Sequence, residues 1–586
     1  MRKVLDFLFL SVFVVVTSSC NIDDVITTVL SPKIILDSQT GVYSVKQGRE
    51  IVIAPSYDSA AGATYQWTMG AEVLSTSPSL RFESDTVGEY FVTITITTEG
   101  GSASEEIRID VLALEVPTVT IAGYRSQSVA VGTTINYQAS VRETSLTTTL
   151  QWSLNEDIVG EGTTYTFDAD AVGHYTISVT ATNEDGTHSD TVEVEVLNAE
   201  DMPFRWEFGR TAYHTVVGRK LLIAPTEVSD EQDIAYLWQM EGETLGEESH
   251  LKFSTDSAGD YTITATATAN KGGEQITYTR EFRVTVYEEG AFYRAKSGAS
   301  KADFDRVYEY TPAPGQFINE TKTGGFDGTQ TTAEAAIAYA EARMKETDSN
   351  GNPNPIWVSL GGFGGYIVVG FDHSVDNSGD YDLGVKGNSF SGSSEPGVVW
   401  VMQDENGNGE PDDTWYELAG SETGKAETTQ NYAVTYYRPS GAEMAVQWSD
   451  NLGNWGQIDY LKQFHRQEYY YPLWIEGDSY TLTGTLLEAR SFDASGNGSY
   501  WVNAEYDWGY VDNFSPVDLL TDSDNAAADI NANHFKISNA IDIDGEHIDL
   551  DYIDFVKVQC AVNAKSGWLG ELSTEVAGFF DYNMKK

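Results

Sequence analysis

A repeated spacing of tryptophan, glycine and tyrosine constrains the fold of this chain more than any other feature of its sequence. Trp67, Trp152 and Trp238 lie 85 and 86 residues apart, in the similar segments YQWTMGAEVL, LQWSLNEDIV and YLWQMEGETL. In each copy a glycine follows the tryptophan by 21 residues and a tyrosine by 23, which gives Gly88 and Tyr90, Gly173 and Tyr175, and Gly259 and Tyr261. Three matching copies indicate three repeats of one structural unit.

Each repeat has the pattern of a β-sandwich. Residues 90–96 (YFVTITI) and 175–182 (YTISVTAT) alternate in polarity and are rich in β-branched residues, as half-buried strands are. We expect the tryptophan to fill the space between two sheets, and this core role is favoured over a carbohydrate-binding one. The Gly-x-Tyr step predicts a tyrosine corner, in which the phenol hydroxyl bonds to nearby backbone. The copies resemble PKD and related immunoglobulin-like domains over about residues 32–288.

The predicted fold is therefore mainly β, with three tandem sandwiches at residues 32–113, 114–199 and 200–288. Each sandwich would span about 30 Å along its strands, so the array suits a spacer of roughly 60 to 100 Å. Residues 289–586, called the head below, form a larger β-rich C-terminal domain with one or two short helices. Nine of the thirteen tryptophans lie in the head.

The N-terminus predicts export and a lipid anchor. Residues 1–20, MRKVLDFLFLSVFVVVTSSC, run from a basic start through an apolar core to small residues, as secretory signals do. Cys20 follows TSS and resembles the lipidated cysteine of bacterial lipoproteins; an ordinary cleavable signal is the alternative. Residues 21–31 would be a tether, in which Asp23 and Asp24 resemble the acidic tag of Bacteroidetes surface lipoproteins. This implies a location on the outer membrane at the cell surface, anchored through lipid only.

Charge and cysteine content narrow the function further. The formal net charge is −54, which repels phosphate backbones, excludes nucleic acid as a partner and favours divalent cations. The second cysteine, Cys560, lies in FVKVQCAV, where it shares one strand face with Val556, Val558 and Val562. We therefore expect a buried, apolar role for Cys560. After Cys20 no apolar run approaches the roughly 20 residues of a membrane helix.

The best helix candidate in the head is TTAEAAIAYAEARMKE, residues 331–346. Thr331 and Glu334 have the spacing of a capping box, and Ile337, Ala340 and Met344 fall on one face. Elsewhere short apolar runs alternate with turns rich in glycine, asparagine, serine and aspartate. The glycine-rich segment GGFGGY (361–366) leads into an apolar strand pattern, whereas a dinucleotide-binding fold needs a helix there.

The acidic stretch QDENGNGEPDDTW, residues 403–415, has the first half of a calcium-loop pattern. Counted from Asp404, oxygen side chains fall at positions one, three, five and nine, with glycine at six. Position twelve is Trp415, which excludes a standard EF-hand. The stretch predicts either a structural Ca²⁺ site or an Asx-rich turn that holds Trp400 and Trp415 in place. The candidate calcium ligands are Asp404, Asn406, Asn408, Glu410, Asp412 and Asp413.

Two stretches rich in aromatic residues, 448–474 and 499–514, are candidates for a ligand surface. Exposed ring faces flanked by acids and amides suit flat or amphipathic ligands, although a core role is the alternative for each ring. The candidate ligand-binding residues are Trp448, Trp455, Tyr460, Tyr469, Tyr470, Trp474, Trp501 and Trp508.

Three segments of the head carry a family resemblance. GGYIVVGFDHSVDNSGDYDLGVKGN, SEPGVVWVMQDENGNGEPDDTWYELAGSE and DIDGEHIDLDYIDFVKV resemble the C-terminal domain of Bacteroidetes proteins known as cell surface proteins, over about residues 357–560. Genes of such proteins cluster with corrinoid uptake receptors. The resemblance implies capture of a nutrient, with cobalamin (vitamin B12) as the first choice, and transfer to a TonB-dependent outer-membrane receptor. It implies no particular binding residue.

Catalysis is not expected. The chain has no His-Glu-x-x-His, Gly-x-Ser-x-Gly or Cys-x-x-Cys motif. We therefore predict a protein that is not an enzyme and has no catalytic cofactor. A glycan-binding surface lipoprotein and a cell-surface adhesin are the alternatives to nutrient capture.

Overall fold

The structure, a computed structural model, describes residues 30–142, 144–229, 234–271, 274–321, 326–351, 353–520 and 532–585. Cys20, Asp23 and Asp24 lie outside the described residues. The chain forms two compact units, residues 1–115 and 116–586. Strands dominate both units, so the predicted fold class, mainly β with immunoglobulin-like sandwiches and a larger β-rich C-terminal region, is confirmed.

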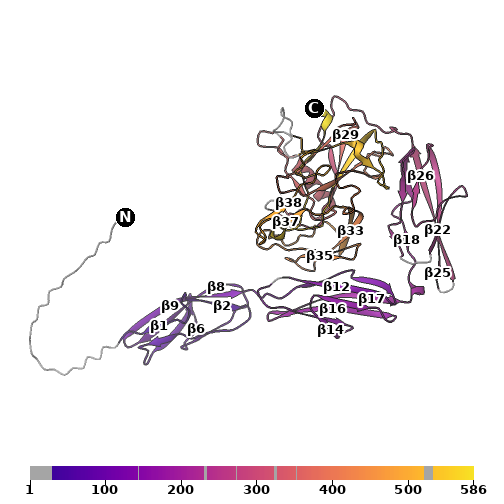
Figure 1. Cartoon of the computed structure of the whole chain (residues 1–586). Helices are drawn as coiled ribbons and strands as arrows, with labels where there is room; N and C mark the ends of the chain where they lie inside the picture. Colours follow the sequence, from indigo (N-terminus) through magenta and orange to yellow (C-terminus); the bar gives the residue numbers. More distant parts are fainter. Residues whose placement is uncertain are drawn as a thin grey trace, which may run out of the picture. The chain divides into compact units, whose positions relative to one another are not determined.

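The first unit is one sandwich (Figure 1). Its larger sheet has the strand order β2-β9-β8-β5-β6, in which β2 and β9 are parallel and the other pairs antiparallel. The strands are β2 (Val42–Lys46), β5 (Thr64–Met69), β6 (Glu72–Ser75), β8 (Gly88–Thr98) and β9 (Gly101–Leu112). Two short pairs complete it: β1 (Lys33–Ile35) with β4 (Ser56–Asp58), and β3 (Ile51–Ile53) with β7 (Leu80–Phe82).

The second unit begins with two sandwiches whose larger sheets repeat this topology. One has the order β11-β17-β16-β13-β14, formed by β11 (Ser126–Ala130), β13 (Thr149–Leu154), β14 (Asp157–Glu161), β16 (Gly173–Asn183) and β17 (Gly186–Leu197). The other has the order β19-β26-β25-β22-β23, formed by β19 (Ala212–Val216), β22 (Ile234–Met240), β23 (Glu243–Gly246), β25 (Gly259–Lys271) and β26 (Glu274–Tyr287). Their remaining strands are β10 (Val119–Ala122), β12 (Thr134–Val141), β15 (Thr164–Asp168), β18 (Trp206–Glu207), β20 (Leu221–Ile223), β21 (Glu227–Val228) and β24 (Leu251–Phe253).

The repeated tryptophans and tyrosines have the predicted roles. Trp67, Trp152 and Trp238 have no exposed surface, and each indole Nε1 donates to the carbonyl ten residues later, at 2.8–3.0 Å. Each corner tyrosine donates its hydroxyl to the carbonyl four residues earlier; for Tyr175 and Ala171 the distance is 2.9 Å. One set of contacts therefore recurs three times.

The head is built around a six-stranded sheet of order β27-β29-β41-β31-β32-β40. Its strands are β27 (Arg306–Thr311), β29 (Tyr366–Asp376), β31 (Gly397–Met402), β32 (Tyr416–Leu418), β40 (Ala540–Ile541) and β41 (Tyr552–Cys560). A four-stranded sheet contains β33 (Thr429–Tyr437), β34 (Val446–Asp450), β35 (Trp455–Ile458) and β36 (Ser479–Leu486). The smaller sheets contain β28 (Val358–Ser359), β30 (Leu383–Lys386), β37 (Ser491–Asp493), β38 (Trp501–Asn503), β39 (Ala532–Phe535), β42 (Glu575–Val576) and β43 (Gly578–Asp581).

One face of the six-stranded sheet forms the main core of the head. Val556, Val558 and Cys560 of β41 lie in this core and are fully buried, with Val562 just beyond the strand, as the alternation predicted. Cys560 is a free cysteine, and burial raises the pKa of its thiol to about 11. A thiol with this pKa is a packing group and a poor nucleophile.

The predicted helix is present as α1 (Ala333–Met344). Its N-cap is Thr332, whose hydroxyl accepts from the amide of Ala335, so the expected capping box from Thr331 is wrong by one residue. Adjacent threonines offer two caps, and the sequence pattern does not discriminate between them. Ala340 and Met344 are buried and Ile337 packs against them, as predicted.

The segment 361–366 is a tight turn that leads into β29, so a strand follows it as predicted. Gly361 has φ +69°, and a β-carbon there would lie 2.0 Å from the carbonyl oxygen of Ala313. Only glycine fits at this position.

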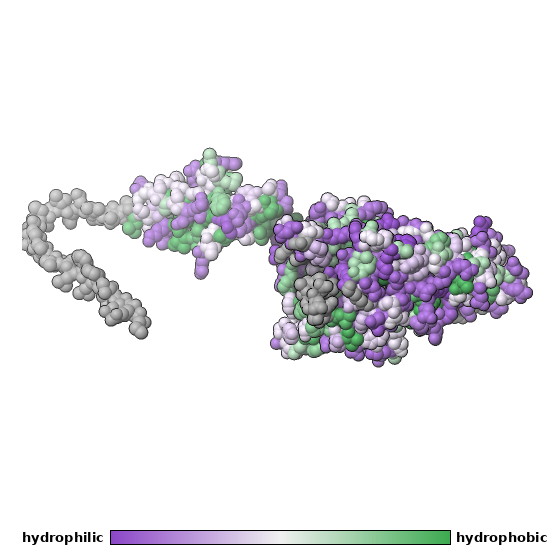
Figure 2. Space-filling model, turned by 90° about the horizontal axis from the view of Figure 1, so that it is seen from above, coloured by the Kyte–Doolittle hydropathy of each residue, from purple (hydrophilic) through white to green (hydrophobic). Residues whose placement is uncertain are grey.

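The visible face of the molecule is mostly polar or intermediate in hydropathy, with hydrophobic residues in small patches (Figure 2). Over the described residues, no helix combines the length and apolar character that a bilayer crossing requires.

Candidate functional site

Lys557 occupies the centre of the second face of the six-stranded sheet. It pairs with Val368 of β29 on one side and Trp400 of β31 on the other. Val368 in turn pairs with Glu309, and Trp400 with Glu417. Because directly paired residues project from the same face of a sheet, these side chains form one row across five strands.

Three aromatic rings surround the ammonium group of Lys557. Its Nζ lies 4.9 Å from the ring centroid of Trp400, 4.9 Å from that of Trp415 and 5.9 Å from that of Tyr366. These distances are in the range of cation–π interactions. The rings stabilise the positive charge without accepting a conventional hydrogen bond.

The ammonium group of Lys557 makes no hydrogen bond and no ion pair with any described residue. Burial lowers its pKa to about 8, while the charges of Glu309 and Glu417 act in the opposite direction. At neutral pH the group is therefore still mostly protonated and offers three N–H donors. A half-buried cation without an acceptor is a costly feature, and an oxygen atom of a ligand would satisfy it.

The two acids of the row are held by neighbouring hydroxyl groups. Glu309 Oε2 accepts from the hydroxyl of Tyr366 at 2.9 Å. Glu417 Oε2 accepts from Thr485 Oγ1 at 2.5 Å, and burial raises the pKa of Glu417 to about 6. Both side chains are therefore oriented by the protein.

The row borders an open cleft of about 500 Å³ between the six-stranded sheet and β36. This volume is in the range of roughly 300 to 1,000 Å³ that is usual for small-molecule sites. The lining combines ring faces, apolar side chains and hydrogen-bonding groups, with contributions from Tyr366, Trp415, Tyr480, Leu482, Lys557 and Gln559. We call it the Lys557 cleft.

The acidic stretch 403–415 forms the loop between β31 and β32 and so connects Trp400 to Trp415. Asp404 accepts from the amides of Gly407 at 2.7 Å and Gly409 at 3.0 Å. The side-chain amide of Asn408 donates to both oxygens of Asp412. The remaining predicted ligands, Asn406, Glu410 and Asp413, belong to the same network. These Asx-type contacts order the loop, and calcium binding there stays a prediction.

Two of the eight predicted ligand-binding aromatics are core residues, which corrects the expectation for them. Tyr470 is 0% exposed, and its hydroxyl donates to the carbonyl of His465. Trp474 is 5% exposed and packs against the rings of Tyr310 and Phe326, with centroids 5.9 and 5.8 Å away. Both rings are enclosed by other side chains and present no face to a ligand.

The other six predicted aromatics are partly exposed but lie in different places. Trp448 and Tyr460 pack on the core of the four-stranded sheet, and Trp455 stacks on Tyr437. Trp508 lines a separate pocket of about 280 Å³. Trp501 donates to the carbonyl of Gly498, and Tyr469 is partly buried. All eight lie in the described part of the chain, and none lines the Lys557 cleft.

Lys557 is not among the site residues predicted from the sequence. A signal was present, because FVKVQC places a lysine among valines in a strand whose other face is core. Trp400, in the segment VVWVM, likewise lies among valines in a strand. A charged or indole side chain inside an otherwise apolar strand indicates a second face with its own function.

The lowered pKa of Lys557 predicts a pH-dependent stability difference. Between pH 8 and about 10.4, the ordinary lysine pKa, the unfolded chain binds more protons than the folded chain, so stability rises with pH through this window. Lys557→Met should be more stable than wild type at pH 7, by on the order of 1–3 kcal/mol, and should lose this advantage toward pH 10. Calorimetric melting of both proteins from pH 7 to 10 tests this; parallel curves would contradict it.

Comparisons with known proteins agree with the sandwich repeats. The model of the PKD-like domain matches residues 31–98, and that of the PKD domain matches residues 118–196. No curated protein matches the chain.

Several solved structures are similar to parts of the chain at low identity and low TM-score. The fibronectin(III)-like modules of Clostridium thermocellum CbhA are 16% identical, cover 30% of this chain and 98% of their own, and have a TM-score of 0.18. The three N-terminal domains of the bacteriophage RB49 Hoc protein are 15% identical, with 44% and 99% covered and a TM-score of 0.21. The titin I-band fragment I67–I69 is 15% identical, with 44% and 98% covered and a TM-score of 0.22.

Proposed function

We propose that this protein is a non-catalytic binding protein that captures a small amphipathic ligand in the Lys557 cleft. The observation that carries the proposal is the Lys557 ammonium group, which lies among three aromatic rings and has no acceptor among the described residues. Such a site suits a ligand with an acceptor oxygen beside a flat or apolar face. The rings would contact that face, and Lys557 would donate to the oxygen.

The proposed setting is the cell surface. Cys20 would carry the lipid, and Asp23 and Asp24 would direct the protein to the outer face of the outer membrane. The first sandwich would act as a spacer between the lipid and the second unit. The second and third sandwiches do not hold the head at a distance, because they contact it directly: Thr120 bonds to Ser440, and Lys220 forms an ion pair with Asp542. The matches of PKD-type models to the first two repeats support a binding or adhesive surface protein.

Cobalamin is the first ligand to test, and a TonB-dependent receptor is the proposed recipient. A corrinoid combines a broad macrocycle with peripheral carboxamide oxygens, so it offers both features that the cleft requires. A glycan is the alternative ligand, since sugar rings stack on indoles and present hydroxyl oxygens.

An adhesin is the second candidate function. It is favoured by the PKD and immunoglobulin-like character of the repeats. An adhesin would bind a host matrix protein or cell surface through a broad area, and the Lys557 cleft would have no small ligand.

Isothermal titration calorimetry on residues 30–586 tests the proposal. Cyanocobalamin and a panel of oligosaccharides are titrated into the protein at tens of micromolar. Saturable heat with a stoichiometry of one is expected for one of these ligands. Absence of heat for all of them, together with binding to matrix-coated surfaces, would overturn ligand capture in favour of adhesion.

A further inference from the structure

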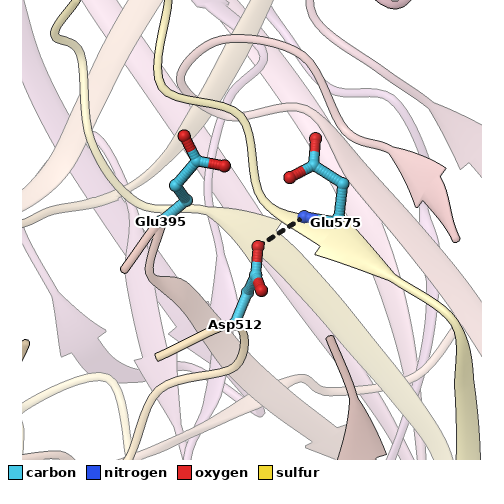
Figure 3. Close-up of side chains that lie close together, drawn as sticks. All are labelled: Glu395, Asp512 and Glu575. Atoms are coloured by element: carbon cyan, nitrogen blue, oxygen red, sulfur yellow. Dashed lines mark hydrogen bonds between the residues drawn. The ribbon is translucent and has the colours of Figure 1, made fainter. Parts of the chain in front are cut away.

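A second site lies in the head, apart from the Lys557 cleft. Glu395, Asp512 and Glu575 each offer a carboxylate oxygen, and these oxygens lie within 4.8 Å of one another. Figure 3 shows the carboxylates of Glu395 and Glu575 side by side, with Asp512 beneath them. We call these three residues the carboxylate cluster. Glu395 lies just before β31, Asp512 lies between β38 and β39, and Glu575 lies in β42.

The carboxylate cluster is buried and lacks a positive partner. Asp512 is 0% exposed, Glu575 is 1% exposed and Glu395 is partly buried. No lysine, arginine or histidine forms an ion pair with any of them among the described residues. Burial, followed by repulsion from Asp512, raises the pKa of Glu395 to about 8, and burial also raises the pKa of Asp512 to about 7. Three carboxylates in this environment require either protons or a cation.

Glu575 supplies an independent indication of a ligand. Its Oε1 is buried and has no hydrogen-bond donor among the described residues. In Figure 3 the side chain is directed into the cluster, toward Glu395. Asp512, by contrast, accepts from the amides of Asn388 at 2.8 Å and Glu575 at 3.0 Å and is fixed in place. The cluster therefore combines a positioned carboxylate with a buried oxygen that has no donor.

We propose that Glu395, Asp512 and Glu575 together bind one hard divalent cation, of the Ca²⁺ or Mn²⁺ class, which links three distant segments of the head. Carboxylate oxygens alone select hard cations, and carboxylates can bind in mono- or bidentate fashion. Because the three segments are far apart in sequence, the cation would act as a structural cross-link that stabilises the folded head. A proton shared between Glu395 and Glu575 is the competing occupant.

Metal titration of the full chain tests this site. The protein is stripped with EDTA, dialysed and titrated with CaCl₂, MnCl₂ and MgCl₂, with metal content measured by mass spectrometry. Wild type should bind one more equivalent of divalent metal per protein than Glu575→Gln or Glu395→Gln. The melting temperature of wild type should rise by about 5 °C at saturating metal. Asp412→Asn changes the acidic loop 403–415 and should still bind the equivalent of metal that belongs to the carboxylate cluster. This variant therefore distinguishes binding at the cluster from binding at the loop.

Glu571→Gln is the matched control. Glu571 is also a buried glutamate, and its Oε2 likewise has no donor among the described residues; its Oε1 accepts from the amide of Gln316, and it is not part of the cluster. This variant should bind metal like wild type.

The sign of the effect distinguishes metal binding from a shared proton. Without metal, Glu575→Gln should melt at or above wild type, because a glutamine side chain needs neither a proton nor a cation to stay buried. With metal it should melt below wild type. The metal site is refuted if no divalent cation raises the melting temperature of wild type, or if metal raises the melting temperature of Glu575→Gln by as much as that of wild type. In either case a proton occupies the cluster.

Discussion

Lys557→Met is expected to weaken ligand binding by about 10- to 100-fold, because it removes a charge-assisted hydrogen bond from a partly buried site. Methionine keeps the length and apolar contacts of the lysine stem, so the rings of Trp400 and Trp415 should stay in place. The dissociation constant is measured by calorimetry, with cyanocobalamin as the first probe and the oligosaccharide panel as the second.

The control for this prediction is Lys565→Met. Lys565 is a surface lysine that forms an ion pair with Asp459 at 2.5 Å and lies outside the cleft. Binding should not change in this variant. Because Lys557→Met is expected to stabilise the fold at pH 7, unfolding cannot account for a loss of binding. An unchanged dissociation constant in Lys557→Met would contradict the assignment of the cleft.

Trp152→Ala is expected to destabilise the second sandwich by about 3–5 kcal/mol, the usual cost of removing a fully buried aromatic side chain. The variant also leaves the carbonyl of Gly162 without its indole donor. Hydrogen exchange followed by mass spectrometry should show faster exchange in β13, β16 and β17. The two cores of the head should keep their exchange pattern, and the head its ligand affinity, because neither core contains a residue of the second sandwich.

Tyr124→Ala is the control in the same repeat. The Tyr124 side chain is 57% exposed, so its removal should change the stability by less than about 0.5 kcal/mol. If Trp152→Ala has an equally small effect, the tryptophan does not organise the sandwich.

The repeats could be predicted because their signals are local. A tryptophan, a glycine and a tyrosine at constant spacing define one strand pair and one corner, and three copies confirm each other. The apolar face of β41 was predictable for the same reason, because alternation within one strand places Val556, Val558 and Cys560 together. Such patterns can be interpreted from the sequence without knowledge of the tertiary fold.

The site was harder to predict because it depends on strand order. Glu309, Val368, Lys557, Trp400 and Glu417 are neighbours across the sheet in that order, which is not their order in the chain. The carboxylate cluster likewise joins residues from three distant segments. No local sequence pattern indicates that these residues lie close together in the folded chain.

Aromatic density was a misleading guide to the ligand surface. Indole and phenol rings serve both cores and binding sites, and composition does not tell which. Tyr470 and Trp474 are enclosed because their neighbours in space are other rings, including Tyr460, Tyr310 and Phe326. Of the rings that line the cleft, Tyr366 and Tyr480 lie in strands β29 and β36, and Trp415 lies in the loop before β32.

Labelling of Lys557 in the presence and absence of ligand tests the central claim most directly. At pH 8 about half of the Lys557 amines are neutral, given a pKa of about 8, whereas ordinary lysines are almost fully protonated. Limited acetylation followed by peptide mass spectrometry should modify Lys557, and the tightest ligand of the calorimetric panel should protect it. The extent of acetylation of Lys565 should be the same with and without ligand. Equal acetylation of Lys557 at zero and saturating ligand would show that the ligand binds elsewhere.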